Sequence, residues 1–595
     1  MGPGIGAHEE DSKVQPLRQQ VEELDDDDET WLERLRRRKW GKFIFGDYDW
    51  SFLCMPTLPW SPARSPPPFY DKDAEISLLL ALTMGLQHAL AMVGGIIAPV
   101  IILTKSARFR PEEQQYLISA ALILSGVTSL VQITQIKIPY TRYVLGTFCS
   151  VRQRSSMCPS AMATLRLCSC GGVACLVGDT CDICPGTLSG SCLTEREAYG
   201  RVLGTIFITS WLLVALSFAP RKFYTKVFPP IVTGPFIIIV GVNLVATGFS
   251  QWGGGTTCAS QVLTSKVLCD GNGDVVLPFG DAHYIGLGLS VIAAILLVEL
   301  FGSPFLRNSQ VVIGLLVGMI VASTVHVTKC EGDECTEYRF VKYDKVHEAP
   351  WTTYLYRYTY PLGVYPPAIL PMLVCAAVSI LNGIGDVTAT YEASRLDPSG
   401  PEFERSIQGT ILADGFNSVF SSLSSMLPTN SYAQNNGVIS LSGCASRRAG
   451  YGCVFWLIFL GTFSKFAALV LVIPDCVIGA MTTFLFATIS VSGLQILNTQ
   501  KEFTRRDRFI VTMALGIGFG VSVVPAWVNI TGQAGYPNEG NLWPVDPNWS
   551  PAYRGLRDGI VQFLSNGYSA CAVLATLLNL ILPMDKNKSL YLPIS

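Results

Sequence analysis

The feature that most limits the fold of this chain is a succession of long apolar segments. A helix needs about 20 mostly apolar residues to cross the hydrocarbon core of a bilayer, and segments of this kind recur along the sequence. Charged residues make up only 15% of the chain, whereas a soluble domain carries roughly 25%. A chain with so little polar surface cannot stay in water as separate domains, so we expect a polytopic protein embedded in the lipid bilayer.

Fourteen segments are candidates for membrane-spanning helices. Twelve are clear, and they cover residues 77–104, 115–136, 200–219, 229–249, 284–302, 311–328, 366–391, 407–426, 451–473, 478–496, 508–526 and 558–582. Two are irregular, one within 143–178 and a short one that begins at Asn430. The sequence therefore predicts an all-α membrane domain of about fourteen spans over residues 75–582, between polar tails of residues 1–74 and 583–595.

The distribution of Lys and Arg predicts the orientation of these spans, because cytosolic connections carry an excess of both. If the N-terminal tail is cytosolic, the even-numbered connections are cytosolic too. They carry Arg221, Lys222, Lys226, Arg307, Arg395, Arg405, Arg447, Arg448, Lys501, Arg505, Arg506 and Arg508. The other connections are poorer in these residues, so we expect both tails of the chain in the cytosol.

Cysteine pairs and glycosylation sequences occur in the connections expected outside the cytosol. A cysteine pair can form a disulfide in an oxidising space, and an Asn-x-Ser/Thr sequence is an acceptor for N-glycosylation. The residues are Cys258 and Cys269 in one connection, Cys330 and Cys335 in a second, and Asn529 and Asn548 in a third. These features agree with the orientation that the basic residues predict.

Two carboxylates fall inside predicted spans. Asp386 lies past the midpoint of the span at 366–391, and Asp414 lies near the middle of the next span. Ionisable residues inside a membrane are costly, so each is by default a hypothesis for a functional site. The alternative is that they cap helices or pair with Arg395 and Arg405. The polar residues around Asp386 favour a role in proton coupling.

A Gln-His pair, Gln87 and His88, lies in the first span. An intramembrane histidine either takes part in function or forms a structural hydrogen bond. We favour the structural interpretation for His88.

The stretch 428–443 is too polar for an ordinary helix that faces lipid. Irregular polar backbone is tolerated at membrane depth only where protein or a water-filled cavity supplies hydrogen bonds, and interrupted helices of this kind build substrate sites in transporters. Gln434 offers a donor and an acceptor, which match the edge of a heterocycle or an amide, and Tyr432 can stack on a planar ligand. A polar outer loop is the alternative, which the length and apolar end of the stretch disfavour.

Other classes of function find little support in the sequence. A net charge of −2 excludes a strongly basic nucleic-acid binder. The chain has no H-E-x-x-H or Gly-x-Ser-x-Gly motif of an enzyme. Its one C-x-x-C motif, at Cys181 and Cys184, lacks the His partners of a zinc site. We therefore expect no enzyme activity, metal, cofactor or nucleic-acid partner.

Several motifs of this chain resemble those of the nucleobase–ascorbate transporter family, and within it the fungal uric acid–xanthine permeases. The sequence that starts at Gln434, Gln-Asn-Asn-Gly-Val-Ile-Ser-Leu-Ser-Gly, resembles the family signature Q-N-x-G-x-x-x-x-T-R/K/G and departs from it only in Ser442. Further matches begin at Gly46, Gly85, Pro229, Ile384, Ile407, Ala413 and Phe503. The resemblance thus covers nearly the whole chain.

The resemblance implies a particular architecture and activity. Members have fourteen spans in two inverted repeats of seven, with short strands in the interrupted spans, and they form homodimers. The implied core domain covers about 77–219 and 284–441, and the implied gate domain about 229–249 and 451–582. The implied function is symport of xanthine or uric acid with protons across the plasma membrane, by an elevator-like movement of the core against the gate.

The resemblance also implies roles for individual residues. Gln434 would bind the purine edge, Tyr432 would stack on the ring, Ala433 would offer its backbone N–H, and Asn435 would support the site. Asp386 and Asp414 match acidic positions that are tied to proton coupling. The supporting positions are Gln87, His88, Thr388 and Gly437.

The chain departs from the family pattern in two places. Asn382 occupies the substrate-site position of a family glutamate, four residues before Asp386. An asparagine keeps hydrogen-bonding ability but cannot titrate, which predicts altered specificity, weakened binding or loss of transport, unless water or the ligand's tautomer compensates. The segment 148–192 replaces the family's third span and contains eight of the eighteen cysteines. We interpret it as a local reading-frame or splicing error; a genuine segment would mean a damaged third span.

Three other functions are alternatives to a proton-coupled purine permease. The two departures favour a transport-impaired relative that acts as a ligand sensor or a membrane scaffold. A membrane-embedded enzyme lacks supporting motifs. A passive channel fits the interrupted polar helix beside an acidic span less well than alternating access does.

Overall fold

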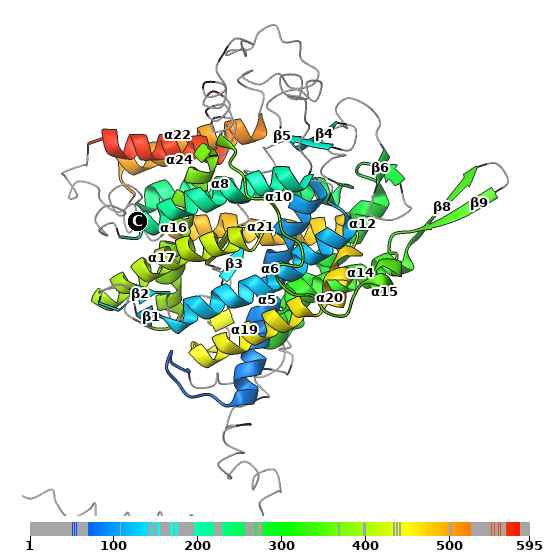
Figure 1. Cartoon of the computed structure of the whole chain (residues 1–595), viewed down its shortest axis with the longest axis horizontal. Coiled ribbons are helices and arrows are strands. Elements are labelled where there is room, and N and C mark those ends of the chain that lie inside the picture. The colour runs from blue at the N-terminus through cyan, green and yellow to red at the C-terminus, as the bar shows by residue number, and fades with distance from the viewer. Residues whose placement is uncertain are drawn as a thin grey trace, which may run out of the picture.

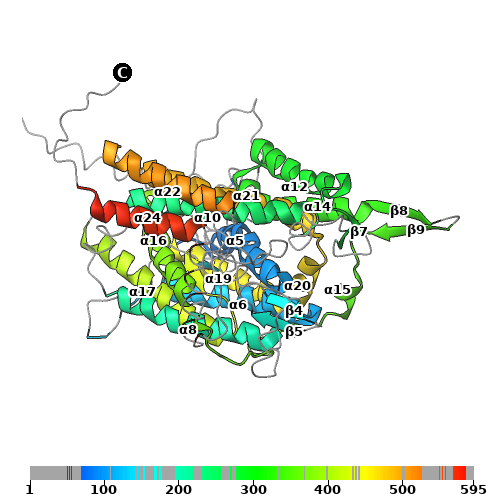
Figure 2. The same ribbon diagram turned by 90° about the horizontal axis from the view of Figure 1, so that it is seen from above.

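A computed structural model describes most of the predicted membrane domain. The described residues are 69–106, 109–137, 195–218, 229–255, 276–331, 334–366, 369–396, 400–431, 442–498, 503–524 and 567–583, with shorter stretches within 44–55, 139–176, 268–270, 435–439 and 549–564. Long helices lie side by side in a bundle (Figure 1), and the same arrangement is visible from above (Figure 2).

Six helices of the described chain are long and apolar enough to cross a membrane. They are α5 (Leu78–Ser106), α6 (Pro111–Thr134), α8 (Glu195–Leu216), α10 (Pro230–Trp252), α12 (Ala282–Phe301) and α21 (Asp475–Asn498). The prediction of a helical membrane protein is thereby confirmed. Fourteen spans and inverted repeats stay predictions.

The remaining helices complete the bundle. The longer ones are α14 (Gln310–Thr324), α16 (Ile369–Ala393), α17 (Pro401–Leu423), α19 (Arg447–Thr462), α22 (Arg505–Val523) and α24 (Gly567–Ile581). The short ones are α13 (Pro304–Asn308), α15 (Asp344–Glu348) and α20 (Ser464–Leu471).

Glycines set the close approach of α10 and α21, the most extensively packed pair of helices in the described chain. Gly234, Gly241 and Gly248 are spaced by seven residues and therefore lie near one face of α10. A Cβ atom at Gly241 would lie 2.2 Å from the Oγ of Ser490, so a larger residue has no room. Small residues let helix backbones pack closely within a membrane.

Two further groups of helices pack in the same way. Helix α19 lies against α5 and α6, and α17 lies against α8 and α16. Gly85 on α5 faces Gly452 on α19, where a Cβ atom at Gly85 would lie 2.3 Å from the Gly452 carbonyl carbon. Helices α16 and α17, which carry Asp386 and Asp414, are thus held from one side by α8.

Five two-stranded antiparallel sheets accompany the described helices. They pair β1 (Ile136–Lys137) with β2 (Val144–Leu145), β3 (Arg152–Arg154) with β10 (Thr429–Ser431), β4 (Leu167–Cys170) with β5 (Val173–Leu176), β6 (Leu268–Asp270) with β7 (Val276–Pro278), and β8 (His326–Glu331) with β9 (Glu334–Arg339). The β8–β9 hairpin projects from the bundle (Figure 1). The β3–β10 pair joins the start of the unusual segment 148–192 to the polar stretch 428–443.

Several predicted features of the connections lie outside the described residues. Cys258, Asn529 and Asn548 are among them, as are the side chains of the remaining paired cysteines. The backbone register of the hairpin places Cys330 directly opposite Cys335. Residues opposite each other on antiparallel strands have Cα atoms about 4.5–5.5 Å apart, which is within the range of a disulfide.

Candidate functional site

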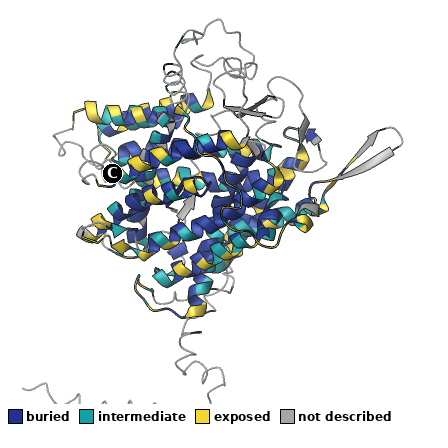
Figure 3. Cartoon of the chain, viewed as in Figure 1, coloured by how far each residue is buried: buried dark blue, intermediate teal, exposed yellow. Residues whose placement is uncertain are grey.

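The interior of the bundle contains polar residues from helices far apart in the sequence, within the buried region shown in Figure 3. Asp386 on α16 is buried, with 8% of its surface exposed, and its Oδ2 accepts a hydrogen bond of 2.5 Å from the Ser431 hydroxyl at the end of β10. Thr388 is half-buried and donates to the Ile384 carbonyl of its own helix. The Asp386 carboxylate therefore lies at the junction of α16 and the β10 strand.

Asp414 lies beside the same stretch of α16. It is fully buried on α17. A Cβ atom at Gly383 would lie 3.2 Å from the Asp414 Oδ2, so the glycine provides the space for the carboxylate. Since Gly383 and Asp386 are three residues apart on one helix face, the two carboxylates flank one small region of the interior.

The Gln-His pair of α5 contacts two other parts of the bundle. Gln87 and His88 are 0% and 5% exposed. The Nδ1 of His88 lies 3.2 Å from the Oδ1 of Asn435, which follows β10. The Oε1 of Gln87 accepts a hydrogen bond of 2.7 Å from the Nδ2 of Asn308 at the end of α13. His88 thus contacts the polar stretch through Asn435.

Strand β10 brings the polar stretch to this region. Ser418 of α17 donates to the carbonyl of Thr429 in β10 at 3.3 Å. Asn430 pairs with Gln153 in the β3–β10 register. About two turns earlier on α17, Thr410 accepts a hydrogen bond of 3.3 Å from the Gln132 amide of α6. Helix α17 therefore connects β10 to α6 through buried polar contacts.

Two asparagines of the polar stretch 428–443 each have one buried side-chain atom without a hydrogen-bond partner in the described part of the chain. These atoms are the Nδ2 of Asn435 and the Oδ1 of Asn430. A buried polar atom without a partner is destabilising unless water or a ligand satisfies it. One donor and one acceptor are therefore available to a polar ligand.

Several predicted site residues cannot be placed. Tyr432, Ala433, Gln434 and Gly437 lie outside the described residues, and the description of Asn382 is limited to its backbone in α16. Among the residues that the sequence also singled out, Asp386 and Asp414 lie on the packed helices α16 and α17, and His88 contacts Asn435. Groups of three or more His, Cys, Asp or Glu side chains able to hold a metal ion are absent from the described residues.

Two partners in this network were not predicted from the sequence. Ser431 donates to Asp386, and Asn308 donates to Gln87. Ser431 lies inside the polar stretch, so its polarity was a signal, but the contact with α16 depends on the tertiary fold. Asn308 lies near a predicted membrane boundary, where a polar residue carries no signal of burial.

A second polar network lies at the start of α5. We call residues 69–76 the α5 strap. Its backbone pairs with the chain before α19, where the Tyr70 N–H donates to the Gly443 carbonyl at 2.8 Å and the Ala445 N–H donates to the Tyr70 carbonyl at 2.9 Å. The strap therefore connects α5 and α19 beside their glycine contact.

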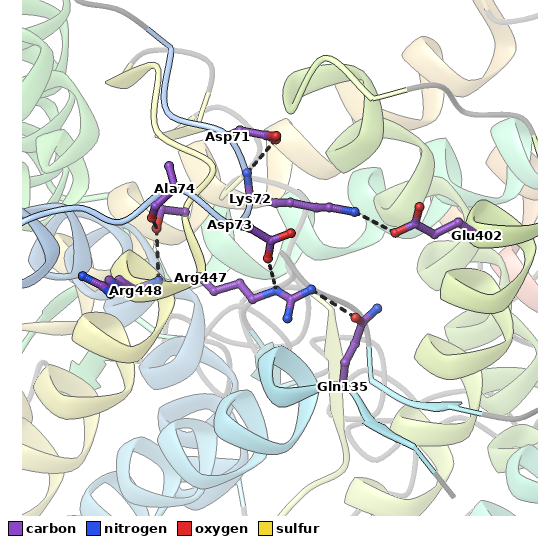
Figure 4. Close-up of polar contacts among 9 residues, drawn as sticks. Asp71, Lys72, Asp73, Ala74, Gln135, Glu402, Arg447 and Arg448 are labelled. Atoms are coloured by element: carbon purple, nitrogen blue, oxygen red, sulfur yellow. Dashed lines mark hydrogen bonds and ion pairs between the residues drawn. The ribbon is translucent and has the colours of Figure 1, made fainter.

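Side chains extend this network to α6 and α17 (Figure 4). The Lys72 Nζ donates to the Glu402 carboxylate of α17 at 2.7 Å. Arg447 lies 3.6 Å from Asp73 and donates to Gln135 at 3.3 Å. Burial lowers the pKa of Lys72, but the hydrogen bond from Lys72 and the negative charge of Glu402 outweigh that effect, so the pKa lies above its usual value.

Known proteins resemble this chain along most of its length. Residues 80–527 match a family model described as the permease family. The uric acid-xanthine permease of Emericella nidulans is 38% identical over 545 residues, 91% of this chain and 88% of the relative. A purine permease of the same organism is 37% identical over 546 residues, 91% and 88% of the two chains. The xanthine permease XanQ of Escherichia coli is 27% identical over 459 residues, 77% and 85% of the two chains.

These relatives are named as permeases, which are transporters and not enzymes. The family match spans most of the chain, and two fungal relatives exceed 30% identity over nine-tenths of it. This chain therefore belongs to the permease family that contains the xanthine and uric acid permeases its motifs resemble.

Proposed function

We propose that this protein carries xanthine or uric acid into the cell together with protons. The observation that carries the proposal is the Asp386–Ser431 hydrogen bond, which places a buried carboxylate at β10, next to the signature sequence of the family. Named relatives transport purines, and the polar atoms of Asn430 and Asn435 are available beside this carboxylate. A purine has several ring nitrogens and carbonyl groups that match such donors and acceptors.

The signature sequence supplies the proposed substrate contacts. Gln434 binds the purine edge with its amide, Tyr432 stacks on the ring, and Ala433 offers its backbone N–H. Asn435, which His88 contacts, supports the site, and Gly437 and Thr388 are further supporting positions. Because these contacts come from a short segment, small movements of the segment change affinity.

Asp386 and Asp414 are the proposed proton-coupling residues. A buried carboxylate is costly to keep ionised. Binding a proton removes that charge, so the loaded site crosses the membrane interior at lower free energy. Coupling follows if the proton and the purine bind to the same conformation of the site.

Movement of the site completes the proposed cycle. The groups α5–α6–α19 and α8–α16–α17 move as one core against a gate that includes α10 and α21, in an elevator-like motion. In this division α19 belongs to the core, because it packs on α5 and α6, which refines the boundaries expected from the resemblance. The protein works as a homodimer in the plasma membrane, with both tails in the cytosol.

Asn382 is proposed to lower the affinity for the purine. It lies one turn before Asp386 on α16, at the position where the family has a glutamate. Losing a charge-assisted hydrogen bond weakens binding by about 1.5–3 kcal/mol, or one to two decades of affinity. We therefore propose weaker purine binding than in glutamate-containing relatives, and Asn382→Glu is expected to lower the KM.

The experiment is uptake of radiolabelled xanthine and uric acid by cells that lack their own purine permeases. Two sequences are compared, this chain and one with a transcript-verified 143–196 segment. Saturable uptake that a protonophore abolishes supports the proposal. Uptake by the verified sequence alone assigns the defect to the unusual segment. No uptake by either, with the protein present at the surface, contradicts a permease for these purines.

A transport-impaired sensor or scaffold is the second candidate, favoured by Asn382 and the unusual segment 148–192. It predicts that the purified protein binds xanthine without transporting it. A thermal shift on addition of xanthine, measured beside the uptake assay, separates the two functions.

A further inference from the structure

A buried hydrogen bond joins α5 to the short helix α13, outside the proposed substrate contacts. The Nδ2 of Asn308 donates to the Oε1 of Gln87 at 2.7 Å. Gln87 is fully buried and Asn308 is 8% exposed. The amide of Asn308 is therefore largely shielded from solvent. Its hydrogen bond to Gln87 connects α13 to α5.

The two helices meet along matching faces. Leu80, Met84 and Gln87 are spaced by four and three residues, so they share one face of α5. Phe305 and Asn308 are three residues apart and share one face of α13. Phe305 packs against the cluster that contains Leu80 and Met84, and Asn308 meets Gln87 at the end of the same line of contacts.

This contact has a direct path to the candidate site. Gln87 is followed in the chain by His88, whose Nδ1 lies 3.2 Å from the Oδ1 of Asn435. Neighbouring residues on a helix point about 100° apart, so Gln87 and His88 hold different sides of α5. A rotation of α5 about its axis would lengthen both contacts together.

We propose that Asn308 is a positioning residue for purine binding. It fixes the rotation of α5 through Gln87, and His88 then holds Asn435 in the orientation that the site requires. The inference rests on the proposed function, since it assigns a role in binding to a residue that does not touch the purine. It assigns α13 to the support of the site, a role that the family motifs do not suggest.

The primary test is Asn308→Leu, which removes the amide at similar volume. The Gln87 oxygen then stays buried without its donor, which destabilises the present orientation of α5. A change in that orientation would move His88 and, through it, Asn435. We expect the KM for xanthine uptake to rise about tenfold, with the turnover rate per surface molecule changed less than about twofold. Gln310→Leu is the matched control, because its Oε1 lies at the same helix junction without a hydrogen-bond partner among the described residues; it leaves the KM within about twofold.

A double variant distinguishes positioning from general stability. If Asn308 acts through Gln87, then Asn308→Leu changes the KM less than about twofold in a Gln87→Leu background. A purely structural contribution predicts that the two effects multiply. Multiplication of the effects, or a normal KM in Asn308→Leu alone, overturns the proposal.

A second measurement covers variants that reach the surface poorly. Asn308→Ser keeps a small polar side chain, and the xanthine-induced thermal shift of the purified protein reports binding without transport. We expect the shift to be reduced in Asn308→Ser and normal in Gln310→Leu, whereas an unchanged shift in both overturns the proposal. Failure of the unmodified chain both to bind and to take up purines would contradict the proposed function itself, and that result is distinct from a normal Asn308 variant.

Discussion

Helix α5 is held by two polar networks that differ in their exposure to water. At its start, the α5 strap forms ion pairs whose acidic partners Glu402 and Glu75 have 70% and 83% of their side chains exposed. Along its middle, Gln87 and His88 are at most 5% exposed. Water solvates the exposed charges well when a pair breaks, whereas a buried group that loses its partner stays unsatisfied. The buried network should therefore dominate both stability and function.

The largest difference is expected between a buried and an exposed carboxylate. Asp386→Ala removes the acceptor of Ser431 and the proposed proton site, so uptake should fall at least about 100-fold with the protein still at the surface. The same change at exposed Glu402 should alter uptake less than about twofold. Initial rates, divided by surface protein, give both numbers. Equal losses in the two variants would remove the distinction between buried and exposed polar groups.

A half-buried arginine offers an intermediate case. Arg506 donates to the carbonyl of Asn579 at 2.6 Å and to the carbonyl of Leu582 at 3.2 Å, so it caps the end of α24. Arg506→Ala should lower the free energy of unfolding by about 1–2 kcal/mol. Arg505→Ala is the matched control, because Arg505 is exposed. Thermal melts of the purified variants test this, and an equal loss in both would show that the capping contacts contribute nothing.

A helix cap gives a smaller effect with a defined pH dependence. Burial raises the pKa of Asp281, but the hydrogen bonds from the His283 backbone and ring outweigh it, and the pKa lies below its usual value. The cap therefore stabilises α12 above about pH 4, the pKa of an unfolded aspartate, and this contribution is lost as the pH falls through the lower folded pKa. Asp281→Ala should cost about 1 kcal/mol at pH 7 and less in acid. A pH-independent difference in melting temperature would contradict this origin.

The smallest effect is expected in the strap. Lys72→Ala should cost about 0.2–1 kcal/mol, and less at high salt, because its partner Glu402 is largely exposed. The exchange Lys72→Glu with Glu402→Lys should restore the stability. Melting temperatures at low and high salt measure both variants. If Lys72→Ala lowers the free energy of unfolding as much as Arg506→Ala does, the ion pair of the strap contributes more to stability than an exposed pair should.

The sequence was sufficient for the apolar helices and for the main polar residues of the interior. Length and hydropathy determine a spanning helix, and Asp386, Asp414 and His88 stood out because each lies within an apolar span. A polar residue stands out in the sequence of an apolar membrane span, whereas the sequence of a soluble protein does not show which polar residues are buried.

The partners of these residues could not be predicted in the same way. Ser431 meets Asp386 only because β10 turns back against α16, and Asn308 meets Gln87 only because α13 packs across α5. Both contacts join residues far apart in the chain, and neither Ser nor Asn has a spacing that indicates its partner. Residues 69–76 are polar and resemble a tail, so the sequence does not indicate the contacts of the strap.

The most direct test of the account is accumulation of xanthine in liposomes that contain the purified protein. An imposed pH gradient, acidic outside, should drive xanthine above its external concentration, and collapse of the gradient should abolish accumulation. In Asp386→Asn, which keeps a hydrogen-bonding side chain but cannot titrate, xanthine should equilibrate without accumulating. Accumulation that persists in this variant, or that follows a sodium gradient in the absence of a pH gradient, would contradict proton coupling through Asp386.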